Sequence, residues 1–123
     1  MIGTVDEVVI DCADPAVVAR FWADVLGGTP TERDPAWWYI RPPGWTQLSF
    51  QRVPERKSGK NRLHIDVLVD DLAAATEQAE RLGARRSGPV RVSPGGSFQV
   101  LTDPEGNEWC VVRPGAPAGP PGS

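Results

Sequence analysis

Apolar and polar residues alternate along the segment from Lys60 to Asp71, which contains the only histidine of the chain. Every second residue from Leu63 to Val69 is apolar, and His64 and Asp66 stand between them. A period of two is typical of a strand that packs one face on a core and turns the other toward more polar surroundings. The pattern therefore predicts a strand with His64 and Asp66 on its polar face.

A helical pattern follows this strand. Asp70 or Asp71 can act as an N-cap, because an aspartate side chain accepts the first free backbone N–H groups of a helix. Apolar residues then recur at helical spacing from Leu72 to Leu82, and Gly83 is placed to end the helix. The segment indicates a strand followed by a helix.

The same order of elements occurs near the N-terminus. Residues 5–11 have the composition of a strand, Asp14 is a candidate N-cap, and Pro15 suits the first helical position. Gly27 and Gly28 should end this helix. Its buried stripe is expected to consist of Val18, Phe21, Trp22 and Val25.

The two halves are related by a spacing of 57 residues, which separates Glu7 from His64 and Asp14 from Asp71. A repeat whose units each contain one helix and several strands predicts two modules that complete each other's core. We expect a single cleft between them, with Glu7 and His64 facing each other across its floor.

Further strands complete the two modules. Strand-like segments occur at Trp37–Ile40, Thr46–Val53, Ala84–Val92, Phe98–Leu101 and Glu108–Arg113. Because both halves should repeat a strand, a helix and three strands, we expect eight strands and two helices in one domain over residues 1–113. Module one covers about residues 1–54 and module two about residues 62–113, joined by a polar connector. Residues 114–123 contain only Pro, Gly, Ala and Ser, a composition that predicts a disordered tail.

Composition narrows the classes of function. The chain has 123 residues, of which 40% are hydrophobic and 24% are charged, and this size and composition are typical of one globular domain. Its net charge of −3 argues against nucleic-acid binding. No apolar run approaches the roughly 20 residues that span a bilayer, and no signal-type segment opens the chain. We therefore expect a cytoplasmic protein that does not bind membranes.

Cys12 and Cys110 are the only cysteines. In the expected compartment two thiols are more often reduced, small apolar residues than a disulfide bridge. Cys12 shares its strand face with apolar residues and should lie under the helix, whereas Cys110 could face either way.

Tryptophan is unusually frequent. Trp22 belongs to the core stripe of the first helix, whereas Trp37, Trp38 and Trp45 crowd into the segment before the fourth strand. Adjacent residues of a strand point to opposite faces, so one of Trp37 and Trp38 should pack inside while the other lines a cleft or a subunit contact. An aromatic wall suits a flat, apolar ligand.

Three stretches together resemble a known family. They are Asp11–Pro15 running on to Leu26-Gly27, then Lys60–Asp66, then Asp103–Glu108. They resemble the glyoxalase-like domains of the vicinal oxygen chelate superfamily, which includes glyoxalase, bleomycin-resistance proteins and extradiol dioxygenases. The resemblance implies the α+β fold of that superfamily, in which paired βαβββ modules form one cupped mixed sheet around a central cleft.

The resemblance also implies where a metal would bind. Metal-dependent members take one ligand from the first strand and one from the last strand of each module, which points to Glu7, Gln47, His64 and Cys110. Cys110 stands where a glutamate is common. Because a thiolate and a neutral amide together suit a hard or borderline divalent ion poorly, we expect no cofactor, with a divalent metal as the alternative.

Candidate roles follow for the cleft residues. His64 could line the pocket and hydrogen-bond Asp66 or Glu7, or it could act as a general acid or base, since an imidazole titrates near neutral pH. Glu7 is the second catalytic candidate, its alternative being an exposed strand end. Gln47 and Asp66 are ligand-binding candidates, together with the three tryptophans Trp37, Trp38 and Trp45.

Two classes of function remain open. The first is a metal-free pocket that binds a small aromatic or apolar molecule, or an unassigned metal-free activity. The second is a metal-dependent lyase, isomerase or dioxygenase of the vicinal oxygen chelate type. The expected partner is a small-molecule ligand, and a homodimer is the expected assembly. Fold cannot select between the classes, because chemistry resides in the site.

Overall fold

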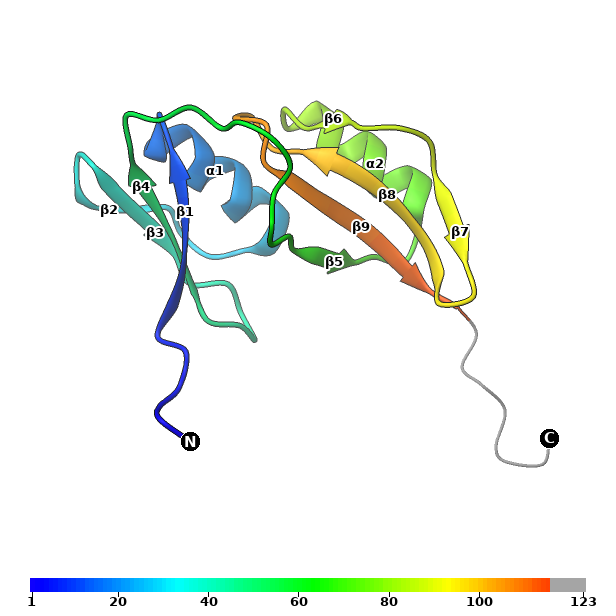
Figure 1. The fold of residues 1–123 in the computed structure, drawn as a ribbon, viewed down its shortest axis with the longest axis horizontal. Coiled ribbons are helices and arrows are strands. Elements are labelled where there is room, and N and C mark those ends of the chain that lie inside the picture. Colours follow the sequence, from blue (N-terminus) through cyan, green and yellow to red (C-terminus); the bar gives the residue numbers. More distant parts are fainter. Residues whose placement is uncertain (116–123) are drawn as a thin grey trace. The chain divides into compact units, whose positions relative to one another are not determined.

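The computed structural model of the chain describes residues 1–115, which divide into two compact units (Figure 1). The first unit consists of residues 1–59 and 103–106. The second consists of residues 60–102 and those from 107 onward. Each unit contains one helix and one mixed sheet, and each is described by itself.

The first unit contains a four-stranded sheet in the order β1-β4-β3-β2, with α1 on one face (Figure 1). Strand β1 runs parallel to β4, and the other neighbours are antiparallel. Its elements are β1 (Glu7–Cys12), α1 (Pro15–Leu26), β2 (Thr31–Asp34), β3 (Trp37–Ile40) and β4 (Gln47–Arg52).

The second unit contains a five-stranded sheet in which β5, β9, β8 and β6 follow one another and β7 also pairs with β8. Strand β5 runs parallel to β9, and α2 packs against β8 and β9 (Figure 1). Its elements are β5 (Asp66–Leu68), α2 (Leu72–Arg81), β6 (Arg85–Arg86), β7 (Arg91–Ser93), β8 (Gly96–Thr102) and β9 (Glu108–Pro114).

Both predicted helices are confirmed, with the caps that the sequence indicated. The Asp14 side chain accepts a hydrogen bond from the backbone N–H of Val17 at 3.3 Å, and Pro15 is the first helical residue. Gly27, with a positive φ of 92°, ends α1 in a conformation that costs glycine little. The Asp71 side chain caps α2 in the same way by accepting from the N–H of Ala74 at 3.0 Å.

The core of the first unit lies between α1 and its sheet. Val18, Phe21 and Trp22 of the helix are buried against Leu48 and Phe50 of β4. Because side chains alternate along a strand, Gln47 and Ser49 point to the face away from the helix. This alternation separates an apolar layer from a polar face.

The two parallel strand pairs share one register. Glu7 is opposite Gln47 and Val9 is opposite Ser49, whereas in the second unit Asp66 is opposite Cys110. Asp66 lies 57 residues after Val9, the spacing that the repeat predicts. The residues opposite them, Ser49 and Cys110, therefore occupy equivalent positions. By the same register the counterpart of Gln47 is Glu108, so the expected ligand set was wrong to use Cys110 as the last-strand equivalent of Gln47.

The predicted strand around His64 is shorter than expected. Only Asp66–Leu68 forms β5, and Leu63, predicted to face the core, is 75% exposed. The parallel ladder begins at Asp66 opposite Cys110, and its first hydrogen bond runs from Cys110 N–H to the carbonyl of Ile65 at 3.0 Å, although β9 itself already begins at Glu108. His64 precedes the strand instead of belonging to it.

The expectation of eight strands is wrong by one in the described residues. The segment 84–92 forms two short strands, β6 and β7, because Gly88 and Pro89 interrupt it. The α+β fold class is confirmed. Where the expectation placed one cupped sheet, the hydrogen bonds describe two mixed sheets, one in each unit.

The chain beyond β9 was predicted to be a disordered tail from residue 114. Pro114 is the last residue of β9, and the N–H of Gly115 donates to the carbonyl of Gly95 at 2.9 Å. The remaining residues of that predicted tail, 116–123, lie outside the described residues.

Candidate functional site: a pocket in the second module

A pocket of about 340 Å³ lies on the face of the second sheet opposite to α2. A cavity of this size is at the lower end of the range that holds small organic ligands. Its lining consists of the apolar side chains Phe98, Val100 and Val112 and the polar side chains Lys60, Asn61, His64, Asp66, Glu108 and Cys110.

Strand alternation sends these side chains to one face. Along β9 the residues Glu108, Cys110 and Val112 line the pocket, whereas Trp109 and Val111 between them are buried on the helix side. Phe98 and Val100 reach the same face from β8. The last two strands therefore supply an apolar wall, and the segment before and within β5 supplies most of the polar groups.

Three chemically active side chains meet at the polar end of the pocket. Nε2 of His64 lies 3.1 Å from Oδ1 of Asp66, and the candidate ligand atoms of His64, Asp66 and Cys110 all lie within 4.8 Å of one another. His64 and Asp66 are about half exposed, and Cys110 is 6% exposed. Asp66 is thus the residue that links the imidazole to the thiol.

The Cys110 thiol is held in its protonated form. Burial raises its pKa to about 11, and the charge of Asp66 and a hydrogen bond with that side chain act in the same direction. Only the thiolate is a strong nucleophile, so Cys110 is not an activated cysteine at neutral pH.

The segment that precedes β5 is fastened to the start of β9. The backbone N–H of Asn61 donates to Oε2 of Glu108 at 2.9 Å, and the Asn61 side chain donates to the carbonyls of Leu63 and Glu108 at 3.3 and 3.4 Å. These bonds hold His64 at the pocket although it lies outside the strand.

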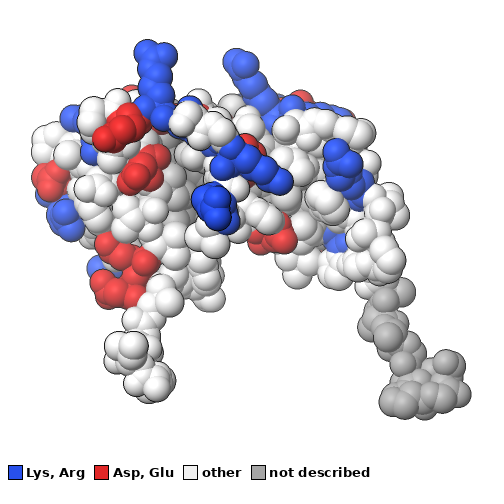
Figure 2. All heavy atoms as spheres, viewed as in Figure 1, with Lys and Arg blue, Asp and Glu red and all other residues white. Residues whose placement is uncertain are grey.

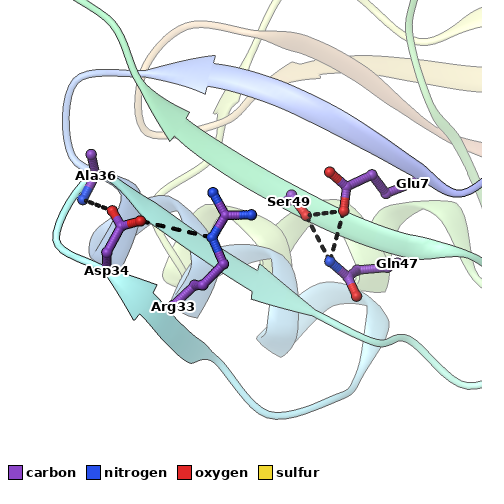
Figure 3. Close-up of polar contacts among 6 residues, drawn as sticks. All are labelled: Glu7, Arg33, Asp34, Ala36, Gln47 and Ser49. Atoms are coloured by element: carbon purple, nitrogen blue, oxygen red, sulfur yellow. Dashed lines mark hydrogen bonds and ion pairs between the residues drawn. The ribbon is translucent and has the colours of Figure 1, made fainter.

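The corresponding positions of the first module form a different polar cluster (Figure 3). Nε2 of Gln47 donates to Oε2 of Glu7 at 2.9 Å and lies 3.0 Å from Oγ of Ser49, which itself donates to Oε2 of Glu7 at 3.2 Å. Arg41 donates from Nε to Oε1 of Gln47 at 3.2 Å. Glu7 is therefore a hydrogen-bonded, half-buried carboxylate and not a free strand end.

Glu7 and His64 belong to different units. The expectation that they face each other across one cleft stays a prediction, and so do their catalytic roles. The structure does bring His64 together with Asp66, and Glu7 together with Gln47.

The three candidate tryptophans all belong to the first unit. The guanidinium of Arg33 lies 4.1 Å from the ring centre of Trp37, whereas Arg20 of α1 lies 5.7 Å from that of Trp38. The two rings thus have different partners, and the one beside Arg20 is on the helix side. Trp45 is 47% exposed. Their role as a ligand wall stays a prediction, and the wall of the described pocket comes from β8 and β9.

Sequence reasoning did not select Phe98, Val100, Glu108 or Val112 as site residues. The signal that could have found them is strand parity: Glu108 and Val112 share the face of Cys110, which was already a candidate. Asp66 was selected as a ligand-binding residue, and its position two residues after His64 also makes it a metal-ligand candidate.

The sequence-based expectations that the protein binds neither nucleic acid nor membranes concern its surface charge and its helices. On the face that Figure 2 shows, basic and acidic side chains are interspersed. Neither described helix has both the length and the apolar character required to cross a bilayer.

Comparisons with solved structures identify the fold. A glyoxalase-related enzyme from Fulvimarina pelagi is 22% identical, with a TM-score of 0.72 over 98% of this chain and 95% of that one. A glyoxalase/bleomycin resistance protein/dioxygenase family enzyme from Burkholderia phytofirmans PsJN is 20% identical, with a TM-score of 0.75 over 87% and 95% of the two chains. The bleomycin-binding protein of Streptomyces verticillus, solved with copper(II)-bleomycin, is 23% identical, with a TM-score of 0.62 over 94% and 100%.

The comparison with curated proteins found no significant match. The sequence profile of the glyoxalase-like domain matches residues 7–112, which span β1 through nearly all of β9. The chain therefore belongs to the glyoxalase-like domain family.

Proposed function

We propose that the chain binds a small, partly apolar or aromatic molecule in the pocket of the second module. The observation that carries the proposal is the division of this pocket into an apolar wall and a polar end. The apolar part of a ligand would pack on Phe98, Val100 and Val112, while a polar group would bond His64 or Asp66. The similar protein from Streptomyces verticillus, described as bleomycin-binding, supports small-molecule binding as one use of this fold.

A fragment screen followed by calorimetry tests this proposal. Because Phe98 supplies the largest apolar surface of the wall, Phe98→Ala should weaken the best hit roughly tenfold. Val92→Ala is the matched control, since Val92 is apolar, lies in the neighbouring strand β7 and is 83% exposed. Equal affinity in both variants would contradict a ligand position against Phe98.

The polar end of the pocket makes a separate contribution. His64→Ala should weaken the same hit by about 1–3 kcal/mol if the imidazole forms a buried hydrogen bond with the ligand. Unchanged affinity of this variant would show that His64 does not contact the ligand. It would not contradict binding against the apolar wall.

The second candidate is a metal-dependent lyase, isomerase or dioxygenase, with His64 and Glu7 as its catalytic candidates. The observation in its favour is the cluster of His64, Asp66 and Cys110. A turnover screen with and without a chelator separates the two candidates. Turnover that a chelator abolishes, and that either His64→Ala or Glu7→Ala removes, supports the enzyme.

Assembly and location complete the proposal. The sequence-based expectations are a homodimer in the cytoplasm that binds neither nucleic acid nor membranes. Light scattering of the purified protein gives its mass in solution, and cell fractionation gives its compartment. A monomer, or a membrane-bound pool, would contradict the corresponding expectation.

A further inference from the structure

We infer that His64, Asp66 and Cys110 form a zinc site that is complete within the second module and leaves one coordination position facing the pocket. Imidazole nitrogen, carboxylate oxygen and thiolate sulfur are all zinc ligands. The inference does not need the organic ligand proposed above. It differs from the set expected from the sequence, which drew Glu7 and Gln47 from the first module.

The spacing of the donors fits one ion. Their candidate ligand atoms lie within 4.8 Å of one another. Tetrahedral zinc with bonds of about 2.0–2.3 Å places its ligands ~3.3–3.6 Å apart. Nε2 of His64 and Oδ1 of Asp66 are already 3.1 Å apart, so only a pair at the upper limit of 4.8 Å has to approach by ~1 Å, and the two half-exposed side chains have room to turn.

The backbone fixes the three residues around one hydrogen bond. Asp66 and Cys110 are opposite each other in the parallel ladder of β5 and β9. The N–H of Cys110 donates to the carbonyl of Ile65, the residue between His64 and Asp66, at 3.0 Å. His64 and Asp66 thus flank the residue whose carbonyl accepts the hydrogen bond from Cys110. A metal site needs backbone support of this kind to hold its ligands in place before the ion binds.

The donor set selects the ion and the coordination number. Cys110 would lose its proton when a metal binds, and the resulting thiolate favours zinc over magnesium or calcium, which prefer oxygen ligands. Three protein ligands plus one open position are typical of catalytic zinc sites, and four protein ligands of structural ones. Here Phe98, Val100 and Val112 line the same pocket, so the open position faces a space for a small molecule.

The first module does not repeat the site. At the position equivalent to Cys110 it has Ser49, and its carboxylate, Glu7, already accepts hydrogen bonds from Ser49 and Gln47 (Figure 3). A hydroxyl and an amide are weaker zinc ligands than a thiolate. The proposed zinc site therefore belongs to the second module alone.

Cobalt titration of chelator-treated protein tests the site, because a cobalt–thiolate bond gives an intense near-ultraviolet absorption. We expect one cobalt ion per chain, displaced by one zinc ion but not by magnesium. Cys110→Ser should abolish the near-ultraviolet band, and Asp66→Asn and His64→Ala should each weaken binding at least tenfold. Melting curves identify any variant that fails to fold.

Two controls make the test specific. Cys12→Ser and Glu7→Gln should keep wild-type stoichiometry and affinity, since neither residue is a proposed ligand. In the Cys12→Ser protein, which retains one cysteine, bound zinc should protect Cys110 from alkylation at least tenfold, a readout that needs no change at the site. Absence of stoichiometric binding, a thiolate band that depends on Cys12, or equal losses in Glu7→Gln and Asp66→Asn would overturn the inference.

Discussion

Glu105 joins two segments of the first unit that lie far apart in the sequence. Its carboxylate accepts from the backbone N–H groups of Ala13 and Asp14, at 2.5 and 2.7 Å, where α1 begins. A carboxylate at a helix N-terminus satisfies free donors and favours the helix dipole. A turn more than 90 residues away in the sequence thus supports the start of the first helix.

Replacing this carboxylate should therefore destabilise the protein. We expect Glu105→Ala to lower the free energy of unfolding by about 0.5–2 kcal/mol, the range of lost helix caps. Glu77→Ala is the control, because Glu77 is an exposed acid in the middle of α2. Urea denaturation measures both, and equal stabilities of the two variants would show that these bonds do not contribute.

Cys12 should make stability depend on alkaline pH. Burial raises its pKa to about 12 from the ordinary 9.0, and the charge of Glu105 acts in the same direction. The folded state then retains the proton more strongly than the unfolded state, so this contribution is full below pH 9 and is lost as the pH rises toward 12. Between pH 8 and 10.5 the stability of Cys12→Ser should fall less than that of wild type. Parallel losses would contradict the prediction.

At the scale of elements, β4 connects the core to the polar face. Leu48 and Phe50 are fully buried under α1, while Gln47 and Ser49 between and beside them form the cluster with Glu7. The same strand thus supplies both apolar packing and a hydrogen-bonded carboxylate.

The buried face of β4 should be far more sensitive to truncation than an exposed strand position. Leu48→Ala should cost about 2–5 kcal/mol of stability, as buried leucine replacements generally do. Val92→Ala, on exposed β7, should change stability by less than ~0.5 kcal/mol. Chemical denaturation distinguishes these values, and a small effect of Leu48→Ala would mean that the core repacks around the cavity.

The elements differ in how well the sequence predicts them. Both helices follow from local chemistry, since Asp14, Pro15, Gly27 and Asp71 act at the positions where caps and terminators are expected. Strand ends depend instead on the partner. The ladder of Asp66–Leu68 with β9 begins only at Cys110, and the carbonyl of Glu108 before it accepts a hydrogen bond from the Asn61 side chain, which alternation within the segment itself does not reveal.

Within the site, alternation along one segment was predictable from the sequence, whereas the register between two strands was not. Alternation correctly grouped His64 with Asp66, and these side chains do lie 3.1 Å apart. It did not show that Cys110 would be opposite Asp66, because register is a property of two strands together. Phe98 and Val100 were missed for the same reason, because their place beside Cys110 and Val112 depends on the pairing of β8 with β9.

At the scale of the whole molecule, the internal repeat explains why two similar modules have different sites. Both retain the parallel register of first and last strands, and Val9 and Asp66 occupy equivalent positions in it. In the first module the carboxylate of Glu7 is occupied by Gln47 and Ser49. In the second, Asp66 joins His64 and Cys110 beside an apolar wall. Divergence at equivalent positions has placed the candidate site in the second module.

We propose that the second-module pocket, and not another part of the molecule, binds a small molecule. Amide chemical shifts of the labelled protein, followed during titration with the best hit of a fragment screen, test it most directly. A ligand in this pocket should cause saturable shifts at His64, Phe98, Val100, Cys110 and Val112 and leave the exposed strand β7 unchanged. Saturable shifts confined to residues outside the pocket lining would contradict it.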